Sequence, residues 1–357
     1  MISRMLTSLV ASIFVVGAMI VSSIEISGQA SRAPARAASV QGTDAVKAFI
    51  ASRMAKNWTP PKAPWGDPDI QGIFTTKDEA NTPFERPEEW AGRRMEDITP
   101  KELAEAIVKR QQRALENAPF AGGGEPEEGV AIAVPIHWFD NLQAKNSRSW
   151  FVIDPADGKV PPLTAQAQAR PAPPPRGLTG GARDSYLDRS LGDRCIAFSP
   201  LRTPGIYGNS HQILQTRDYV VFRYEMIHEA RLIPLDGRPH VSSKVRPHMG
   251  DSRGHWEGNT LVVETTNFNE NMNYRGAPST NLRLIERFTR IAPDKVEWTV
   301  TLDDPTTWTR PWSYSYPMTE DNTQSIHEYA CHEGNYGMAN LLSAGRAAER
   351  KAREVGH

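Results

Sequence analysis

Beyond residue 195, apolar and polar positions alternate along the chain in short runs that are separated by tight turns. Alternation with a period of two predicts half-buried β-strands, and no helical pattern interrupts the series. The sequence therefore predicts a mainly β fold built as an antiparallel meander. Because a meander must cover its edge strands, we expect the sheet to close into a lipocalin-like up-and-down barrel. The predicted strands are residues 212–215, 219–235, 260–268, 282–291, 296–302, 313–318 and 325–331.

The clearest turn in the series is Gly258-Asn259, which stands between Trp256-Glu257 and the β-branched run 260–266. Glycine and asparagine tolerate the positive φ that a two-residue hairpin turn requires, so this segment predicts a hairpin. Ionisable side chains surround the turn, and strand pairing and candidate chemistry therefore share one piece of backbone.

The N-terminal half of the chain is less regular. Thr99, Pro100 and Glu102 form a capping-box pattern that predicts a helix over about 99–117. Residues 67–74 predict a turn that leads into a first strand, a short strand is predicted at 149–153, and residues 163–176 form an Ala/Gln/Pro-rich loop. We expect this segment, residues 57–176, to wrap around a β core formed by residues 177–336. Residues 337–357 predict a basic amphipathic helix that turns Leu341, Leu342, Ala344 and Ala348 toward the body.

The first 30 residues have the pattern of a secretory signal peptide. Arg4 precedes an apolar run over 5–24, and small residues follow it. A retained membrane anchor is the alternative, because the run is close to the length that spans a bilayer. Cleavage would leave 31–56 as a disordered or helical leader, and no later run predicts stable membrane insertion. We expect a secreted or periplasmic protein.

Charge and cysteine content narrow the function further. The formal net charge is −1 at pH 7, which disfavours nucleic acid as a partner. Only two cysteines exist, Cys195 and Cys331, and in an exported chain they predict one disulfide. A reactive thiol beside His332 is the alternative, and an oxidising compartment disfavours it. The sequence does not specify an oligomeric state.

Several motifs occur together in the part of the chain after the leader. They are Asp69-Ile-Gln-Gly-Ile-Phe74, Gly250-Asp-Ser-Arg-Gly-His-Trp-Glu-Gly-Asn-Thr-Leu-Val-Val-Glu-Thr265, Glu286-Arg-Phe288 and Cys331-His-Glu-Gly-Asn335. In combination they resemble a family of exported bacterial proteins without an assigned activity. The resemblance covers nearly everything after the leader and implies no reaction. The lipocalin likeness is an analogy of architecture, and fold alone does not set function.

Two predicted strands carry carboxylates on the same face as apolar residues. Glu264 shares a face with Val262, and Glu286 shares one with Leu284 and Phe288. If the apolar faces point inward, both carboxylates are buried, and burial raises the pKa of a carboxylic acid toward working pH. The acid/base candidates are Glu264, Glu286 and His327, and Arg287 or Arg253 would stabilise negative charge. The alternative is a structural ion-pair network.

Other residues suggest ligand binding rather than chemistry. Aromatic side chains in a barrel mouth would contact an apolar ligand, and the candidates are Trp256, Trp298, Trp312, Tyr314 and His255. In the predicted strand 219–235, Arg231 lies opposite the apolar face, so we expect it at the surface. The alternative is an internal pair of Glu225 and Arg231 beneath a pocket.

Cofactor motifs are missing from the sequence. No nucleotide fingerprint or nucleophile elbow occurs, so we expect no organic cofactor. His327 and His332 are five residues apart rather than four, which excludes the zinc-helix pattern, and no metal ligand is assigned.

Three hypotheses follow. The first is a cofactor-independent lyase, isomerase or hydrolase acting on a small aromatic or terpenoid-like molecule, and polar residues on apolar strand faces favour it. The second is a non-catalytic, lipocalin-like carrier of a small hydrophobic ligand. The third is a metal-dependent enzyme with His, Asp and Glu ligands. If Glu264 and Glu286 both lie on the solvated outer face, the first hypothesis loses its main support.

Overall fold

The computed structural model describes residues 43–116, 147–170, 184–197, 200–201, 204, 210–269, 273–275, 277–278, 280–323 and 325–355. The predicted signal peptide at 1–30 lies outside these ranges. So do residues 31–42 of the predicted leader and the last part of the low-complexity loop.

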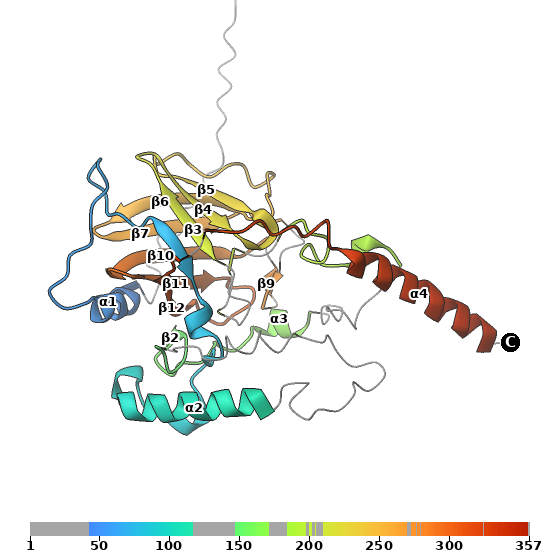
Figure 1. The fold of residues 1–357 in the computed structure, drawn as a ribbon, viewed down its shortest axis with the longest axis horizontal. Coiled ribbons are helices and arrows are strands. Elements are labelled where there is room, and N and C mark those ends of the chain that lie inside the picture. The colour runs from blue at the N-terminus through green and yellow to red at the C-terminus, as the bar shows by residue number, and fades with distance from the viewer. Residues whose placement is uncertain are drawn as a thin grey trace, which may run out of the picture. The chain divides into compact units, whose positions relative to one another are not determined.

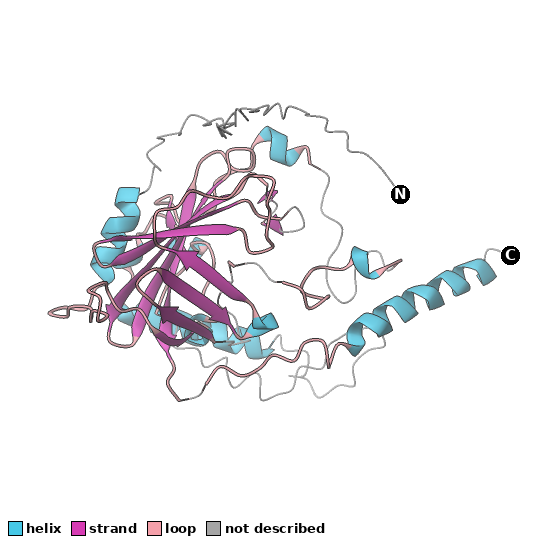
Figure 2. Cartoon of the chain, turned by 90° about the horizontal axis from the view of Figure 1, so that it is seen from above, coloured by secondary structure: helices cyan, strands magenta, loops and turns pink. Residues whose placement is uncertain are grey.

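The described strands form one large antiparallel sheet, shown in Figure 1 and Figure 2. Its order is β5 (Ala230–Pro234), β4 (Tyr219–Tyr224), β3 (His211–Gln215), β1 (Gly72–Thr75), β12 (Trp312–Glu320), β11 (Lys295–Asp303), β10 (Arg283–Ala292), β7 (Thr260–Thr266) and β6 (Asp251–Glu257). A tenth strand, β2 (Val152–Asp154), also pairs with β12. A separate small hairpin joins β8 (Asn273–Tyr274) to β9 (Ala277–Pro278). The predicted mainly β, antiparallel fold is confirmed.

Helices make up a smaller part of the described chain. The α-helices are α1 (Thr43–Arg53), α2 (Pro100–Glu116), α3 (Ala165–Gln168) and α4 (Tyr336–Val355). Short 3₁₀ turns occur at Lys77–Glu79, Glu88–Trp90, Met95–Asp97, Tyr186–Asp188 and Met226–His228. Among the helices within the described ranges, none combines the length and the apolar character that crossing a bilayer requires.

Two local signals in the sequence are confirmed atom by atom. At the start of α2, Thr99 N–H donates to Glu102 Oε2 at 2.8 Å, and Glu102 N–H donates to Thr99 Oγ1 at 3.3 Å, which is the predicted capping box. The Gly258-Asn259 turn joins β6 to β7, with Glu257 opposite Thr260 and Gly258 at φ 59°. Both signals are short-range, so the sequence alone was sufficient to predict them.

The N-terminal segment contributes strands to the sheet itself. β1 lies between β3 and β12 and pairs with both, meeting β12 near its C-terminal end. β2 pairs with the same edge of β12, near the N-terminal end of that strand. The first strand expected at the end of residues 67–74 therefore corresponds to β1, and the predicted strand 149–153 overlaps β2 at residues 152–153. Through β1, this segment connects the β3–β5 part of the sheet to the β6–β12 part.

The predicted long strand 219–235 is wrong. The chain turns between β4 and β5 through the 3₁₀ turn at Met226–His228, where Ile227 adopts φ 60°. The turn restarts the alternation, so Arg231 points to the same side as the core residue Ile233. The expected surface position of Arg231 is therefore also wrong. Glu225, its expected alternative partner, instead accepts a hydrogen bond from Ser210 N–H at 2.9 Å.

The sheet does not close into a barrel by backbone pairing among the described residues, since β5 and β6 end the strand order. The two end strands nevertheless touch through their side chains. Arg231 on β5 donates from Nε to Ser252 Oγ on β6 at 2.9 Å. A Cβ atom on Gly254 of β6 would lie 2.8 Å from Ile233 and 2.7 Å from Leu235. We call this side-chain contact between β5 and β6, formed by these five residues, the β5–β6 seam.

The C-terminal part of the chain is tied to residue 195 by the predicted disulfide. Cys195 and Cys331 are bonded, with Cα atoms 5.7 Å apart, which is compatible with an extracellular or periplasmic protein. The predicted strand 325–331 is wrong, because the described residues there have no regular structure. Of the residues expected to turn α4 toward the body, Leu341 and Leu342 are half-buried, whereas Ala344 and Ala348 are exposed.

Candidate functional site

Glu286 on β10 lies in the interior of the curled sheet, paired with Arg231 from β5. Arg231 donates to both carboxylate oxygens of Glu286, with an Nη1 to Oε1 distance of 3.1 Å. Trp298 Nε1 donates to Glu286 Oε1 at 3.2 Å, and the Glu286 residue is 0% exposed. Arg231 also donates to Ser252 Oγ and, at 2.7 Å, to Thr265 Oγ1. Each charged group therefore has its hydrogen-bonding partners in place.

The electrostatics of this interior pair are visible at Arg231. Burial alone would lower the pKa of Arg231, but the charge of Glu286, with the neighbouring Tyr224, raises that pKa above its usual value. The Glu286 carboxylate accepts hydrogen bonds from a guanidinium and an indole, and both of its oxygens are engaged by the protein itself. This geometry supports a structural ion pair at Glu286 more than a general acid or base.

Glu264 lies on the opposite face of the sheet. In the ladder, Glu264 pairs with Ile285 while Glu286 pairs with Val263, and directly opposed residues share a face. The apolar core contacts β7 through Leu261 and Val263, so Val262 and Glu264 face outward, and the expected inward position of Glu264 is wrong. Because Leu261, Val262 and Val263 are all buried, the sequence of β7 did not indicate which face meets the core.

An ion-pair network surrounds Glu264 on this outer face. His240 Nδ1 lies 2.7 Å from Asp251 Oδ2, and His240 Nε2 lies 3.4 Å from Glu264 Oε1. Arg283 Nη2 lies 2.5 Å from Glu264 Oε2, and Arg253 Nη1 lies 2.6 Å from Asp251 Oδ1. Hydrogen bonds from His240 and Arg283 lower the pKa of Glu264 to about 2. The hydrogen bonds that His240 donates to Glu264 and Asp251 raise the pKa of His240.

The five residues predicted to act in catalysis do not form one site. Glu286 is interior, Glu264 and Arg253 belong to the outer network, and His327 is exposed in the irregular segment after β12. Arg287 lies on the outer face of β10 beside a groove that is described below.

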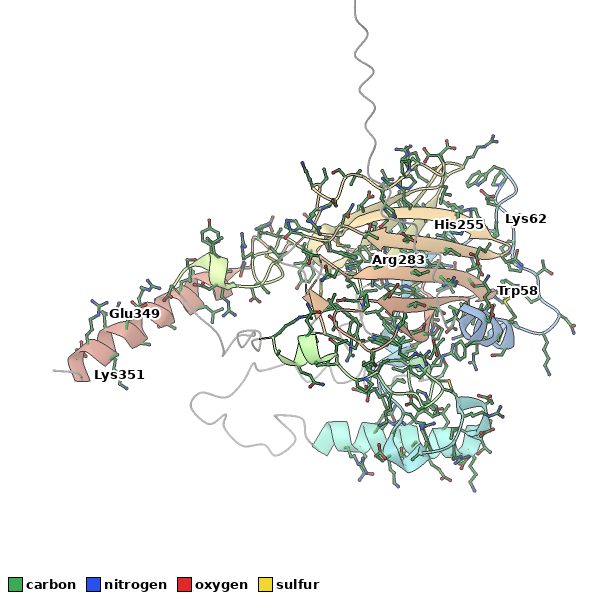
Figure 3. The ribbon with its side chains drawn as sticks, turned by 180° about the vertical axis from the view of Figure 1, so that it is seen from behind. Trp58, Lys62, His255, Arg283, Glu349 and Lys351 are labelled. Carbon is green, nitrogen blue, oxygen red and sulfur yellow. A yellow bond between two sulfur atoms is a disulfide. The ribbon has the colours of Figure 1, made fainter. Side chains whose placement is uncertain are left out.

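The predicted ligand-binding residues are divided between core and surface. Trp298, Trp312 and Tyr314 belong to the apolar core, where the ring centroids of Trp312 and Tyr314 lie 5.9 Å apart. Trp256 packs partly buried against that core. His255 is exposed on the outer face, 3.4 Å from Glu257, on the sheet face where Figure 3 also labels Arg283. Trp312 and Tyr314 pack against each other and against Phe84, whereas Trp298 packs against Phe288 and Tyr316, so all three contribute to the core.

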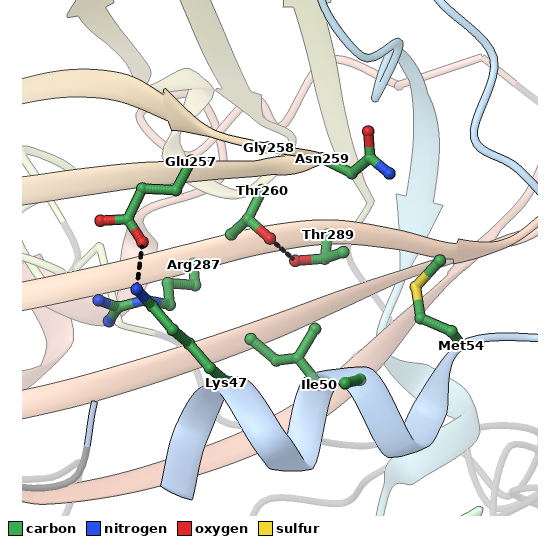
Figure 4. A pocket seen from close by; sticks show the side chains of 10 residues that line it. Lys47, Ile50, Met54, Glu257, Gly258, Asn259, Thr260, Arg287 and Thr289 are labelled. Atoms are coloured by element: carbon green, nitrogen blue, oxygen red, sulfur yellow. Dashed lines mark hydrogen bonds and ion pairs between the residues drawn. The ribbon is translucent and has the colours of Figure 1, made fainter. Parts of the chain in front are cut away.

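A groove lies between α1 and the outer face of the sheet (Figure 4), with a volume of about 480 Å³. We call it the α1 groove. Ile50 and Ala51 of α1, with Met54 just after the helix, supply an apolar wall, and the Gly258-Asn259 turn forms part of the lining of the groove. The remaining lining residues are polar: Lys47, Glu257, Thr260, Arg287 and Thr289.

The polar groups of the α1 groove are arranged in two bonded pairs and one arginine. Lys47 Nζ lies 3.0 Å from Glu257 Oε2, and the hydroxyls of Thr260 and Thr289 lie 2.8 Å apart. Arg287 is 5% exposed. Burial lowers the pKa of Arg287, and the charge of Glu257 acts in the opposite direction. An arginine next to an apolar wall is a favourable position for an amphipathic anion.

The sequence identified Arg287 and the hairpin turn but missed the contribution of α1. That helix falls in residues 31–56, which were expected to be disordered or helical. The available signal was the apolar spacing of Val46, Phe49 and Ile50, and Val46 and Ile50 are indeed buried. The helix is fixed to the sheet at its end, where Ala55 N–H donates to Ile291 O at 2.8 Å.

A second groove of about 430 Å³ lies on the other side of α1, where its lining includes Phe49, Arg53 and Trp150. Within the described ranges, no three His, Cys, Asp or Glu side chains are grouped as a metal ion would require. Comparison of the chain with family models, with curated proteins and with solved structures gave no match in any of the three. The resemblance to an exported family therefore stays a prediction.

Proposed function

We propose that this chain is an exported binding protein for a small, largely apolar molecule, and that the molecule occupies the α1 groove. The observation that carries the proposal is the groove itself, about 480 Å³ in volume with an apolar wall of Ile50, Ala51 and Met54. Pockets of this size, with apolar walls and a few polar groups, commonly hold small ligands. This is the non-catalytic hypothesis, placed on the outer face of the sheet rather than in its interior.

The export part of the proposal rests on the N-terminal pattern and on the disulfide between Cys195 and Cys331. Sequencing the N-terminus of the natively expressed protein tests it. A mature chain that begins between residues 31 and 38 is expected, and a chain that keeps Met1 would contradict cleavage.

The lipocalin-like closure is also part of the proposal. The contact of Arg231 with Ser252 and the packing of Ile233 and Leu235 around Gly254 support a sheet that is closed at the β5–β6 seam by side chains. Closure of this kind would hold β6, and with it the turn at the groove, in a fixed position.

The acid/base enzyme stays a second hypothesis with weaker support. The burial of Glu286 favours this hypothesis, which requires a buried carboxylate. Against it, Glu286 is held by Arg231 and Trp298, and Glu264 lies on the opposite face. A proton-transfer role for Glu286 would require Arg231 to move away first.

Filling the α1 groove tests the binding proposal. The neutral fluorescent probe N-phenyl-1-naphthylamine should bind the native protein with a saturable rise in emission. Ala51 is exposed on α1, and Ala51→Trp places a large ring in the groove. We expect the dissociation constant of the probe to rise about tenfold, because the ring takes the place of roughly as much apolar contact as one buried side chain provides.

The matched control is Ala347→Trp, at an exposed position on α4. It adds the same side chain away from the groove and should bind the probe as the native protein does. Equal affinities of Ala51→Trp and the native protein would show that the probe does not occupy the α1 groove, and the proposal would then be abandoned.

A further inference from the structure

Arg287 differs from the other buried arginines of the described chain. Four of these, Arg148, Arg189, Arg231 and Arg290, have a carboxylate within ion-pair distance: Glu297, Asp193, Glu286 and Glu320 in that order. Arg287 has no such carboxylate among the described residues, and this is the difference, because a buried Nε atom without a hydrogen-bond acceptor is shared by Arg287, Arg148 and Arg290. A buried charge without a partner is costly, so such a group commonly marks a place where a ligand supplies the counter-charge.

The nearest acidic side chain in the α1 groove does not neutralise Arg287. Glu257 acts on the pKa of Arg287 only through space, and its carboxylate is bonded to Lys47 at 3.0 Å. The three charged groups that line the groove sum to one positive charge: Lys47 and Arg287 contribute two, and Glu257 removes one. One negative charge on a ligand would therefore balance the groove.

From these contacts we infer that the α1 groove binds a monocarboxylate, with Arg287 holding the carboxylate and the wall of Ile50 and Met54 holding the apolar part. The inference rests on the proposed function and specifies its ligand class. The planar fork of a guanidinium matches a carboxylate with two parallel hydrogen bonds.

Two hydroxyl groups add to the recognition of the carboxylate. Thr260 Oγ1 and Thr289 Oγ1 lie 2.8 Å apart, so one hydroxyl donates to the other. The second hydroxyl keeps its own hydrogen, and both residues line the groove with Arg287. A ligand oxygen that faces Arg287 can accept that remaining hydrogen.

The test compares an acid with its neutral isostere. 2-Naphthoate and 2-naphthamide have the same ring system, but only the acid is charged at pH 7. Calorimetric titration of the full mature chain should give naphthoate about tenfold tighter binding than naphthamide, since hydrogen bonds between charged groups are stronger than neutral ones. Arg287→Met should remove this preference and leave naphthamide affinity within about twofold.

The variants separate a direct contact from a structural role. Naphthamide needs the same groove, so its binding reports whether Arg287→Met is correctly folded. Arg287→Lys keeps the charge but loses the fork, and it should retain a preference for the acid that is smaller than the native one. Arg223→Met, at an exposed position on β4, is the control and should leave both affinities unchanged.

The possible failures are distinguishable. If the native protein binds naphthoate and naphthamide equally, the carboxylate inference is wrong and the proposed function stands. An undiminished preference for the acid in Arg287→Met would also overturn the inference. If neither compound binds, the inference and the proposed function both fail.

Discussion

Arg231 and Glu286 lie in the apolar interior, where the effect of each charge on stability depends on the presence of the other. Besides their mutual contact, Arg231 donates hydrogen bonds to Ser252 and Thr265, and Glu286 accepts one from Trp298. Arg287 lies next to Glu286 in sequence but on the other face of β10, where none of the described carboxylates is within ion-pair distance of it. Consecutive residues of one strand thus have opposite electrostatic environments.

Removing one member of the interior pair should be severely destabilising. Arg231→Met leaves the Glu286 carboxylate buried without a counter-charge, and we expect a loss of about 3–5 kcal/mol in the free energy of unfolding. Urea denaturation at pH 7 measures it. The double variant Arg231→Met/Glu286→Leu should recover most of this loss, because no unpaired charge remains.

An exposed ion pair provides the matched control for this experiment. Arg94 Nη2 and Asp97 Oδ1 lie 3.1 Å apart on the surface, and Arg94→Ala should leave the free energy of unfolding nearly unchanged, because solvent screens an exposed ion pair. A loss for Arg231→Met as small as the loss for Arg94→Ala would mean that the Arg231–Glu286 interior is hydrated and not an apolar core.

At the scale of elements, the segment 236–250 is attached to β6 and β7 mainly by charge. His240 lies between Asp251 of β6 and Glu264 of β7, and Val241 N–H donates to Asp251 Oδ2 at 3.0 Å. Met249 packs against the core near the end of the segment, whereas residues 236–245 are exposed or half-buried, so the attachment of this first part depends on these polar contacts. Its stability should therefore depend on pH.

The two pKa shifts set the pH range of that dependence. The pKa of His240 is raised from 6.5, so its contribution is complete below pH 6.5 and is lost as the pH rises through the folded-state pKa. The pKa of Glu264 is lowered from 4.5 to about 2, so its contribution is complete above pH 4.5 and is lost as the pH falls toward 2. Both contributions are fully present between pH 4.5 and 6.5.

Replacing the histidine tests this range. The native protein should lose up to about 1 kcal/mol between pH 5.5 and pH 8.5 relative to His240→Gln, a small effect because solvent reaches both side chains. Urea denaturation at the two pH values measures the difference. His255→Gln, on the same face but exposed, is the control. A pH dependence that is identical in His240→Gln and the native protein would contradict the assignment.

At the scale of the molecule, the β5–β6 seam decides whether the sheet behaves as an open sheet or a closed one. The lack of a side chain at Gly254 allows β6 to approach Ile233 of β5 and Leu235, which directly follows β5. The disulfide acts over a similar range, because it closes a separation of 136 residues and should stabilise the fold by about 5 kcal/mol in the chain-entropy model.

A single methyl group tests the seam. In Gly254→Ala the new Cβ would lie 2.7 Å from Leu235 and 2.8 Å from Ile233, so we expect a loss of about 1–3 kcal/mol from overpacking. Gly334→Ala is the matched control, because nothing lies within 4 Å of its added Cβ. Thermal denaturation compares the two variants. Equal melting temperatures would show that β5 and β6 are apart in solution, and closure would then be rejected.

The sequence by itself determined the features that depend on neighbours in the chain or on simple counting. Alternation predicted most of the strands, turn chemistry predicted the β6–β7 hairpin, and Thr99 with Glu102 predicted the start of α2. With only two cysteines in the chain, the disulfide had a single possible pairing.

Only the tertiary structure decided which face of each strand meets the core and which distant groups meet. A turn at Ile227 reversed the expected side of Arg231, and buried residues on both sides of β7 concealed the side of Glu264. The α1 groove combines residues that are more than 200 positions apart, from Lys47 to Arg287. The physical reason is that alternation records only that two faces differ. Which face is inside depends on the contacts that the whole sheet makes when it curls.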